Sequence, residues 1–179
     1  MERAADAIYR RALQLASAYR ERNVTSILAL LEEAATFDHP DACFELANWR
    51  HFGIGAERDD EAAVRLWERA SAQGHMEARM NLAIACERGI GTARDTQRAF
   101  SLYVACAESG DVSALYEAGR CRYYGIGTEV DRDGAEEHFL RARQSGHAEA
   151  TCDAAESDGP RRIPRPAFAG PFRAITTRG

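Results

Sequence analysis

The sequence predicts an all-α protein, a solenoid of antiparallel helix pairs, and three observations support this fold class. Glycines, aspartates and apolar residues recur at intervals of 36 residues, without an insertion, over most of the chain. Within each interval the apolar positions follow the spacing of two helices, and an aspartate or a glycine marks a helix start or end. A unit of this size cannot bury its own apolar face, so neighbouring units must stack.

The repeat is defined by residue types that return at the same phase. The clearest sets are Gly53, Gly89 and Gly125; Gly55, Gly91 and Gly127; Asp59, Asp95 and Asp131; Ala63, Ala99 and Ala135; and Trp67, Tyr103 and Phe139. They predict three full units, residues 39–74, 75–110 and 111–146, and a partial fourth unit over residues 147–156.

Residues 1–38 continue the pattern backwards as a divergent helix pair. Subtracting 36 places Leu31 at the phase of Trp67, which predicts a helix over residues 25–37. Its first partner is expected over residues 3–21, and the turn between them lacks the G-x-G pattern.

The first helix of each full unit ends at a G-x-G turn. In the first unit Ala42 and Trp49 follow helical spacing. Gly53 suits the left-handed conformation that commonly ends a helix, because glycine has no Cβ. Gly89 and Gly125 are expected to end the first helices of the next two units in the same way.

The second helix of each unit begins at an aspartate. The Asp59 carboxylate can accept a hydrogen bond from an unpaired backbone N–H of the first turn, and Asp95 and Asp131 are expected to do the same. Ala63 lets two helices approach closely, while Trp67 fills the space between turns. The sequence therefore predicts these residues to be structural.

Residues 157–179 differ in composition from the rest of the chain. They carry five Arg and one Asp, a net charge of +4, whereas residues 1–156 carry 18 Arg and 27 acidic residues, a net charge of −9. A body of that sign repels nucleic acid and anionic membranes. Because the segment is rich in proline and glycine, it is predicted to be a flexible basic tail. The alternatives are that it covers the last unit or lies in a groove as an internal competitor.

The N-terminus and the apolar runs bear on the compartment. No apolar run approaches the ~18 residues that a membrane-spanning helix needs. The first 21 residues mix charges among their apolar positions, unlike a signal peptide. We therefore expect a cytoplasmic protein with reduced cysteines.

The stretch 123–142 contains a G-I-G turn followed by acidic residues, which raises the alternatives of a phosphate loop and a calcium loop. A phosphate loop requires a preceding strand, and here a helix is predicted. A calcium loop requires a bidentate Glu at its twelfth position, where this chain has Leu140. Since Asp131 shares the phase of Asp59 and Asp95, a helix-capping turn is the favoured interpretation.

Cysteine and histidine do not form a recognisable catalytic or zinc pattern. The five Cys fall at five different phases, which is typical of small apolar core residues. His39, His75 and His147 share the corner between units with Asp111, which favours capping over catalysis. A Cys–His pair formed in space stays open as an alternative. We expect no catalytic residue, metal or cofactor.

These features together resemble the Sel-one-like repeat family, relatives of the tetratricopeptide repeat. The matching residues of the first unit are Ala42, Leu46, Ala47, Gly53, Gly55, Asp59, Ala63, Trp67, Ala70 and Gly74. The resemblance covers residues 39–146 and departs from the family pattern at Arg50, Cys86, Arg122 and Ala118. It implies a right-handed superhelix that serves as a protein-binding scaffold.

A second stripe on the first helices is the candidate binding surface. By resemblance to tetratricopeptide arrays it lines the concave face, and it comprises Asn48, His51, Phe52, Ile84, Glu87, Arg88, Arg120, Tyr123 and Tyr124. Aromatic residues and Arg are common in binding hot spots. The alternative is that the rings only cover the ridge between repeats.

Two functions follow as hypotheses. The first is a monomeric, non-catalytic scaffold or adaptor for a protein or peptide, a class that includes inhibitors and immunity proteins. The second is a hydrolase like the secreted β-lactam-binding members of the family. That function calls for an export signal and for cysteine pairs at a fixed phase, and the sequence has neither pattern.

Overall fold

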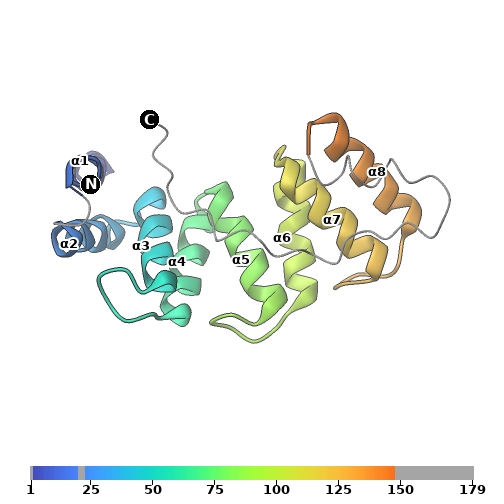
Figure 1. Ribbon diagram of the computed structural model, residues 1–179, viewed down its shortest axis with the longest axis horizontal. Coiled ribbons are helices and arrows are strands. Elements are labelled where there is room, and N and C mark those ends of the chain that lie inside the picture. Colours follow the sequence, from blue (N-terminus) through green and yellow to red (C-terminus); the bar gives the residue numbers. More distant parts are fainter. Residues whose placement is uncertain (1, 20–22, 148–179) are drawn as a thin grey trace.

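The computed structural model describes residues 2–19 and 23–147, which form α-helices and connecting turns (Figure 1). No strand occurs among these residues, and the all-α prediction is confirmed. The helices are α1 (Glu2–Tyr19), α2 (Val24–Thr36), α3 (Pro40–Phe52), α4 (Asp60–Ala72), α5 (Met76–Arg88), α6 (Thr96–Glu108), α7 (Val112–Tyr124) and α8 (Arg132–Gln144).

The helices form a solenoid of pairs. Each helix packs against its neighbours in sequence, and the pairs follow one another along the long axis of the molecule (Figure 1). Helices α3–α4, α5–α6 and α7–α8 are the three units, preceded by the pair α1–α2. The loops that follow α3 and α5 lie along one edge, the lower one in Figure 1. We call this side of the molecule the loop edge.

The second helices begin at aspartates, as the repeat indicated. Asp59, Asp95 and Asp131 are the N-cap residues of α4, α6 and α8. Each carboxylate accepts a hydrogen bond, at 2.8 to 2.9 Å, from the backbone N–H three residues further on. These bonds satisfy donors that a helix N-terminus otherwise leaves unpaired.

The first helices begin at the corner between units. His39 caps α3 and His75 caps α5, each through an Nδ1 atom that accepts a backbone N–H, and the Asp111 carboxylate caps α7. The same helices end at Gly53, Gly89 and Gly125, which have φ values of 67°, 72° and 69°.

The second glycine of the G-x-G turn has a separate role, which the sequence pattern alone did not explain. A Cβ atom at Gly91 would overlap the backbone carbonyl of Asp60, and one at Gly127 would overlap that of Thr96. The loop of one unit therefore rests directly on the backbone where the second helix of the preceding unit begins. Gly55 has a softer neighbour, because a Cβ there would meet a side chain of α2 at 2.7 Å.

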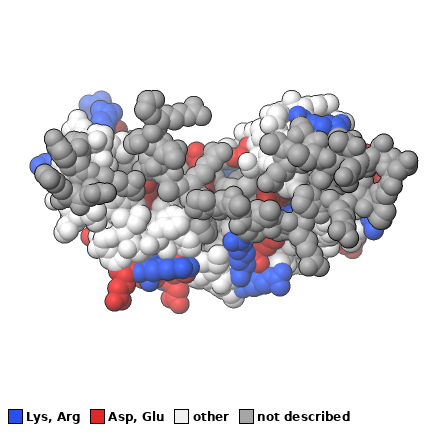
Figure 2. All heavy atoms as spheres, in the orientation of Figure 1, with Lys and Arg blue, Asp and Glu red and all other residues white. Residues whose placement is uncertain are grey.

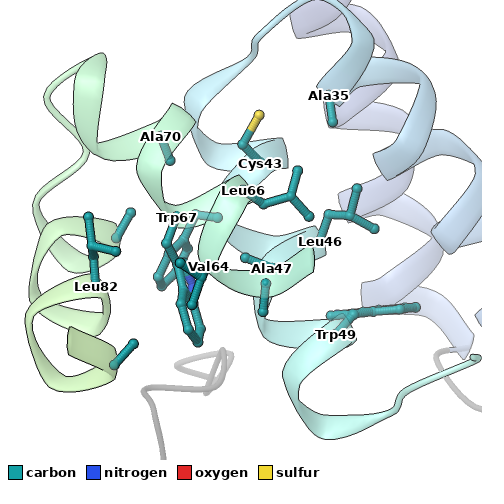
Figure 3. Close-up of a cluster of buried hydrophobic side chains, with 14 of the residues drawn as sticks. Ala35, Cys43, Leu46, Ala47, Trp49, Val64, Leu66, Trp67, Ala70 and Leu82 are labelled. Atoms are coloured by element: carbon teal, nitrogen blue, oxygen red, sulfur yellow. The ribbon is translucent and has the colours of Figure 1, made fainter. Parts of the chain in front are cut away.

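At one repeat phase a large ring of the second helix packs among small residues, and Phe44, Trp49 and Tyr116 are further buried rings on the first helices. Trp67 and Tyr103 are 0% exposed. In Figure 3 the Trp67 indole lies between Leu82 of α5 and Ala47 of α3. Phe139, at the same phase in α8, is only half-buried. The ring is thus completely enclosed in the first and second units, each of which is followed by another described unit.

The ends of the array differ in what the structure describes. Leu31 and Ala34 of α2 are buried at the phases of Trp67 and Ala70, as the backward extension of the repeat predicted. The predicted basic tail over 157–179, and the partial fourth unit apart from His147, lie outside the described residues. Among the described helices, none is long and apolar enough to cross a membrane.

Candidate functional site

Nine residues on α3, α5 and α7 were predicted to contact a partner, and we call them the first-helix face. They do not form one uniform surface. Three of them are buried: Asn48 and Arg120 are 2% exposed and His51 is 7% exposed. Ile84, Glu87 and Tyr123 are half-buried. The exposed members are Phe52, Arg88 and Tyr124. The prediction of a partner-binding stripe is therefore corrected at Asn48, His51 and Arg120, whose side chains are buried.

The buried amide of Asn48 joins the first unit to the second. Its Oδ1 atom accepts hydrogen bonds from Trp67 Nε1 and from Asn81 Nδ2, both at 3.2 Å. The indole N–H is only a donor, so it fixes which side of the Asn48 amide faces it. This neutral network, called the amide seam below, connects α3, α4 and α5.

The second and third units are joined by charges instead. Arg120 Nη2 donates to both carboxylate oxygens of Glu87, at 2.8 and 2.7 Å, and Arg120 Nε donates to Glu117 at 2.6 Å. The Tyr103 hydroxyl donates to the same Glu87 carboxylate at 2.9 Å. This network, called the ionic seam below, connects α5, α6 and α7.

Burial and charge act in opposite directions on the ionic seam. Burial lowers the pKa of Arg120, but Glu117 and Glu87 outweigh it, so the net shift is upward and the guanidinium stays charged. Burial and then the charge of Glu87 raise the pKa of Tyr103 well above its usual value. The hydroxyl therefore remains a donor, and Arg120 is a structural residue because its donors are directed at two carboxylates within the fold.

His51 is held by Asp60, the first residue of α4. Its Nδ1–H donates to Asp60 Oδ1 at 2.7 Å, and Asp60 also accepts from Arg58 Nη2 at 2.7 Å. The imidazole meets the Phe52 ring edge-on, with centroids 4.9 Å apart. Burial lowers the pKa of His51 and the charge of Arg58 adds to this effect, so the net shift is downward although the Asp60 carboxylate raises the pKa. The side chain is thus a neutral, buried support for Phe52.

The exposed members share a single repeat phase. Phe52, Arg88 and Tyr124 are 36 residues apart, and Phe52 and Tyr124 are 39% and 43% exposed. Tyr123 packs edge-on against Tyr124 at 5.0 Å, and the Arg132 guanidinium lies 5.7 Å from the Tyr123 ring centroid. We call Phe52, Arg88 and Tyr124 the exposed row.

A common sequence separation identifies the contacts between neighbouring first helices. Asp6 with His39, Asn48 with Asn81, and Glu87 with Arg120 are all pairs 33 residues apart. The repeat phase alone did not find these pairs, because it compares residues 36 apart. A search for complementary polar residues at a separation of 33 would have found them.

Charged residues along the loop edge form a second feature. Figure 2 shows side chains of both signs along this edge. Two shallow polar hollows lie here at equivalent places in consecutive units. The first is lined by Arg50, Glu57, Arg58, Asp59, Asp60, Glu61 and Gly91, and the second by Arg94, Asp95, Thr96, Gln97, Gly125, Gly127, Thr128 and Glu129. Both hollows are lined by side chains of both charges.

The cysteines within the described residues are buried and unpaired. Burial raises the pKa of Cys43 and Cys86, that of Cys106 to about 11 and that of Cys121 to about 12. Such thiols are poor nucleophiles at neutral pH. In the same part of the chain, no cluster of three His, Cys, Asp or Glu residues is arranged to hold a metal ion.

The stacked helix pairs, the glycine-mediated loop contacts and the polar seams define a helical-repeat solenoid. The sequence model of the Sel1 repeat matches residues 40–75, 77–111 and 112–147. The chain therefore belongs to the Sel1 repeat family. Proteins of this family are generally protein-interaction scaffolds and typically non-catalytic.

Solved structures of similar fold support the architecture. A Sel1 repeat protein from Oxalobacter formigenes is 24% identical with a TM-score of 0.77, over 82% of this chain and 60% of that one. The protective antigen c5321 of uropathogenic Escherichia coli is 19% identical with a TM-score of 0.60, over 82% and 39%. Helicobacter pylori cysteine rich protein B is 18% identical with a TM-score of 0.54, over 68% and 92%.

These likenesses concern the fold. The chain spans 60% of the length of the first of these proteins and 39% of the second. No curated protein matches the sequence.

Proposed function

We propose that this protein is a non-catalytic scaffold that binds a peptide or protein segment on its first-helix face. The observation that carries the proposal is the exposed row, because one repeat phase presents Phe52, Arg88 and Tyr124 on three successive first helices. Aromatic side chains and Arg are the residues that most often dominate binding energy.

The two seams support this surface from beneath. The amide seam fixes α3 against α5, and the ionic seam fixes α5 against α7. The spacing of the row is therefore set before a partner arrives, and a preorganised surface loses less conformational entropy on binding. His51 and Tyr123 add edge-on ring contacts that orient Phe52 and Tyr124.

The chemistry of the row indicates the kind of segment that it would bind. Two exposed rings flank a guanidinium, so a matching segment carries apolar side chains on either side of a carboxylate. We propose that this partner is met in the cytoplasm, with the scaffold acting as an adaptor or as an inhibitor of a cognate protein.

The test is affinity capture from the source organism followed by mass spectrometry of the bound proteins. The test variant carries Phe52→Ala, Arg88→Ala and Tyr124→Ala. The matched control carries Leu13→Ala, Phe37→Ala and Val130→Ala, which also removes three exposed side chains but none from the row. We expect one partner to bind the wild type and the control and to be lost from the test variant.

A partner that binds all three proteins equally would refute the exposed row as the binding surface. Melting temperatures of the three proteins separate lost binding from lost folding, since exposed truncations usually change stability little. Turnover of a chromogenic β-lactam by the wild type, absent in the test variant, would replace the scaffold proposal with the hydrolase.

A further inference from the structure

The corners at His39 and His75 combine a helix cap with a contact to the preceding first helix. The Nδ1 atoms of these histidines lie 3.3 and 3.2 Å from the backbone nitrogen three residues further on, and they accept its N–H. The other ring nitrogen, Nε2, faces the preceding first helix. In His39 it lies 3.1 Å from Asp6 Oδ1 of α1, and in His75 it lies 3.4 Å from Asp41 Oδ1 of α3. Each imidazole therefore joins two first helices.

This geometry requires a single protonation state of the two rings. A ring nitrogen accepts a backbone N–H only while it carries no proton, so the one proton of the neutral imidazole is on Nε2. The side chains of His39 and His75 are 10% and 11% exposed, so water has little access to replace the lost contact. The form of the ring that caps the helix is thus the neutral Nε2–H tautomer.

Carboxylates on three helices favour the charged imidazolium instead. Asp6 of α1 forms an ion pair with His39 once that ring is charged, and Asp41 of α3 is placed to do so with the second histidine. Glu77 of α5 lies 3.5 Å from the Nδ1 atom of His75. Glu77 can accept a hydrogen bond from that atom only after the atom gains a proton.

The aromatic rings at the two corners act in the same direction as the carboxylates. Tyr9 contacts the first histidine and Phe44 stacks on the second, with ring centroids 4.7 and 4.4 Å apart. The face of an aromatic ring stabilises a cation that lies against it. Burial raises the pKa of Tyr9, so its hydroxyl stays neutral. Asp38, beside the first histidine in the sequence, accepts a hydrogen bond from Arg69 at 2.8 Å. The cap and the surrounding groups therefore favour opposite charge states.

The third corner has a different cap and no stacked ring. Asp111 caps α7 through its carboxylate, at 2.8 Å. Carboxylates remain ionised well below the pH at which histidines take up a proton. Met80 stands there at the repeat phase of Phe44, so the ring is absent where the histidine is absent. After the third unit both return, since His147 stacks on Tyr116 at 4.8 Å.

We propose that His39 and His75 form a pH-sensitive switch, in which a proton converts two helix caps into ion pairs with the preceding first helices. When Nδ1 takes up the proton, the capped backbone N–H loses its acceptor, and the first turns of α3 and α5 loosen. The charged rings bind the carboxylates of α1 and α3 more strongly. Mild acid therefore acts on these two corners, while the corner at Asp111 keeps its cap. The switch lies at the opposite ends of α3 and α5 from the exposed row, and it is independent of the partner that the row binds.

Amide hydrogen exchange of the full chain, measured by NMR, tests this proposal with an internal reference. From about pH 7.5 to about pH 5.5, the protection factors of the Ala42 and Ala78 amides should fall ~10-fold. The protection factor of the Ala114 amide, which Asp111 caps, should not change. Protection factors are the suitable measure because they correct for the effect of pH on intrinsic exchange. Nitrogen chemical shifts of the two imidazoles should show the Nε2–H tautomer at the higher pH.

Two matched variants separate the charge of the imidazole from the presence of a cap. His39→Asn combined with His75→Asn replaces both rings by a neutral side chain that is among the strongest N-caps. The pH dependence at Ala42 and Ala78 should then disappear. Asp111→Asn is the control, because it introduces the same amide cap at the corner without a histidine. The pH dependence at the other two corners should remain as in the wild type.

Three results would overturn the proposal. One is protection at Ala42 and Ala78 that does not change over this pH range. Another is an equal loss of protection at Ala114, which would show that acid loosens the whole array. The third is the same decline in the double asparagine variant, because a group other than the two histidines would then be responsible.

Discussion

The amide seam and the ionic seam occupy equivalent places in the repeat but solve the same packing problem with different chemistry. In both, a ring at the same phase donates a hydrogen bond, from the Trp67 indole in one and the Tyr103 hydroxyl in the other. The acceptor is a neutral amide at the first seam and a carboxylate at the second. The comparison teaches that the repeat fixes where the helices meet, while each contact between units has its own side-chain pairing.

The largest expected effect is the loss of the ring at the amide seam. Trp67→Ala should lower the free energy of unfolding by about 3–5 kcal/mol, because it leaves a cavity between helices and removes a donor from Asn48. Chemical denaturation followed by circular dichroism measures it. A cost below that of an exposed truncation such as Phe37→Ala would contradict the central place of the ring.

The next effect separates the two seams directly. Arg120→Ala should cost about 3–4 kcal/mol, because it leaves Glu87 and Glu117 without their buried partner. Asn48→Ala, the matching change at the amide seam, should cost about 1–2 kcal/mol, since only neutral hydrogen bonds are lost.

Denaturation of both variants in the same buffer gives the comparison. Equal costs would mean that the two seams do not differ in energy as they differ in charge. Adding Glu87→Gln and Glu117→Gln to Arg120→Ala should recover part of the loss, because the uncompensated charges are then removed.

The backbone contacts of the glycine loops should contribute equally to stability in the second and third units, whereas the side-chain contacts of the two seams should not. Gly91→Ala and Gly127→Ala should each cost about 2–3 kcal/mol, because the new Cβ overlaps backbone and the positive φ disfavours alanine. Gly110→Ala is the control: its φ is 93°, no heavy atom lies within 4 Å of the added Cβ, and about 1 kcal/mol is expected. Thermal melts that rank Gly110→Ala with the other two would exclude the backbone contact as the cause.

The smallest effect distinguishes the first unit from the second by the pH dependence of stability. His51 stands at the phase that Glu87 occupies in the next unit, and burial lowers its pKa in the folded state below the unfolded value of about 6.5. The unfolded chain therefore binds this proton first, so stability is complete above about pH 6.5 and declines as the pH falls towards the folded pKa. His51→Gln should reduce that decline in melts taken at several pH values, whereas Tyr103→Phe should leave it in place.

Much of the fold followed from phase and spacing alone. Asp59 and Gly53 were predicted as helix boundaries, and they stand at the start of α4 and the end of α3. These boundaries depend on local backbone chemistry, which one residue can reveal. The position of α2 was also predicted closely, over residues 25–37, and the helix is found at Val24–Thr36.

The candidate binding surface was harder to predict from the sequence than the helix boundaries were. A long polar side chain such as Arg120 can lie in solvent or be buried, and the choice depends on whether Glu87, on the neighbouring helix, supplies the opposite charge. Such pairs are not visible when residues are compared at one phase. The row of Phe52, Arg88 and Tyr124 stays a prediction as a binding surface, although its members are the exposed ones.

The stacked glycine loops have a consequence for how such a protein can be rebuilt or can evolve. Their contact is backbone against backbone, so at the loop edge any unit that has the second glycine of the G-x-G turn can follow any other unit. The side chains of the seams do not allow such an exchange of units. A duplicated second unit would place Ile84 of the copy where Arg120 now lies, and Glu87 would lose its counter-charge. The order of the units is therefore encoded on the helices, while the loops leave it unrestricted.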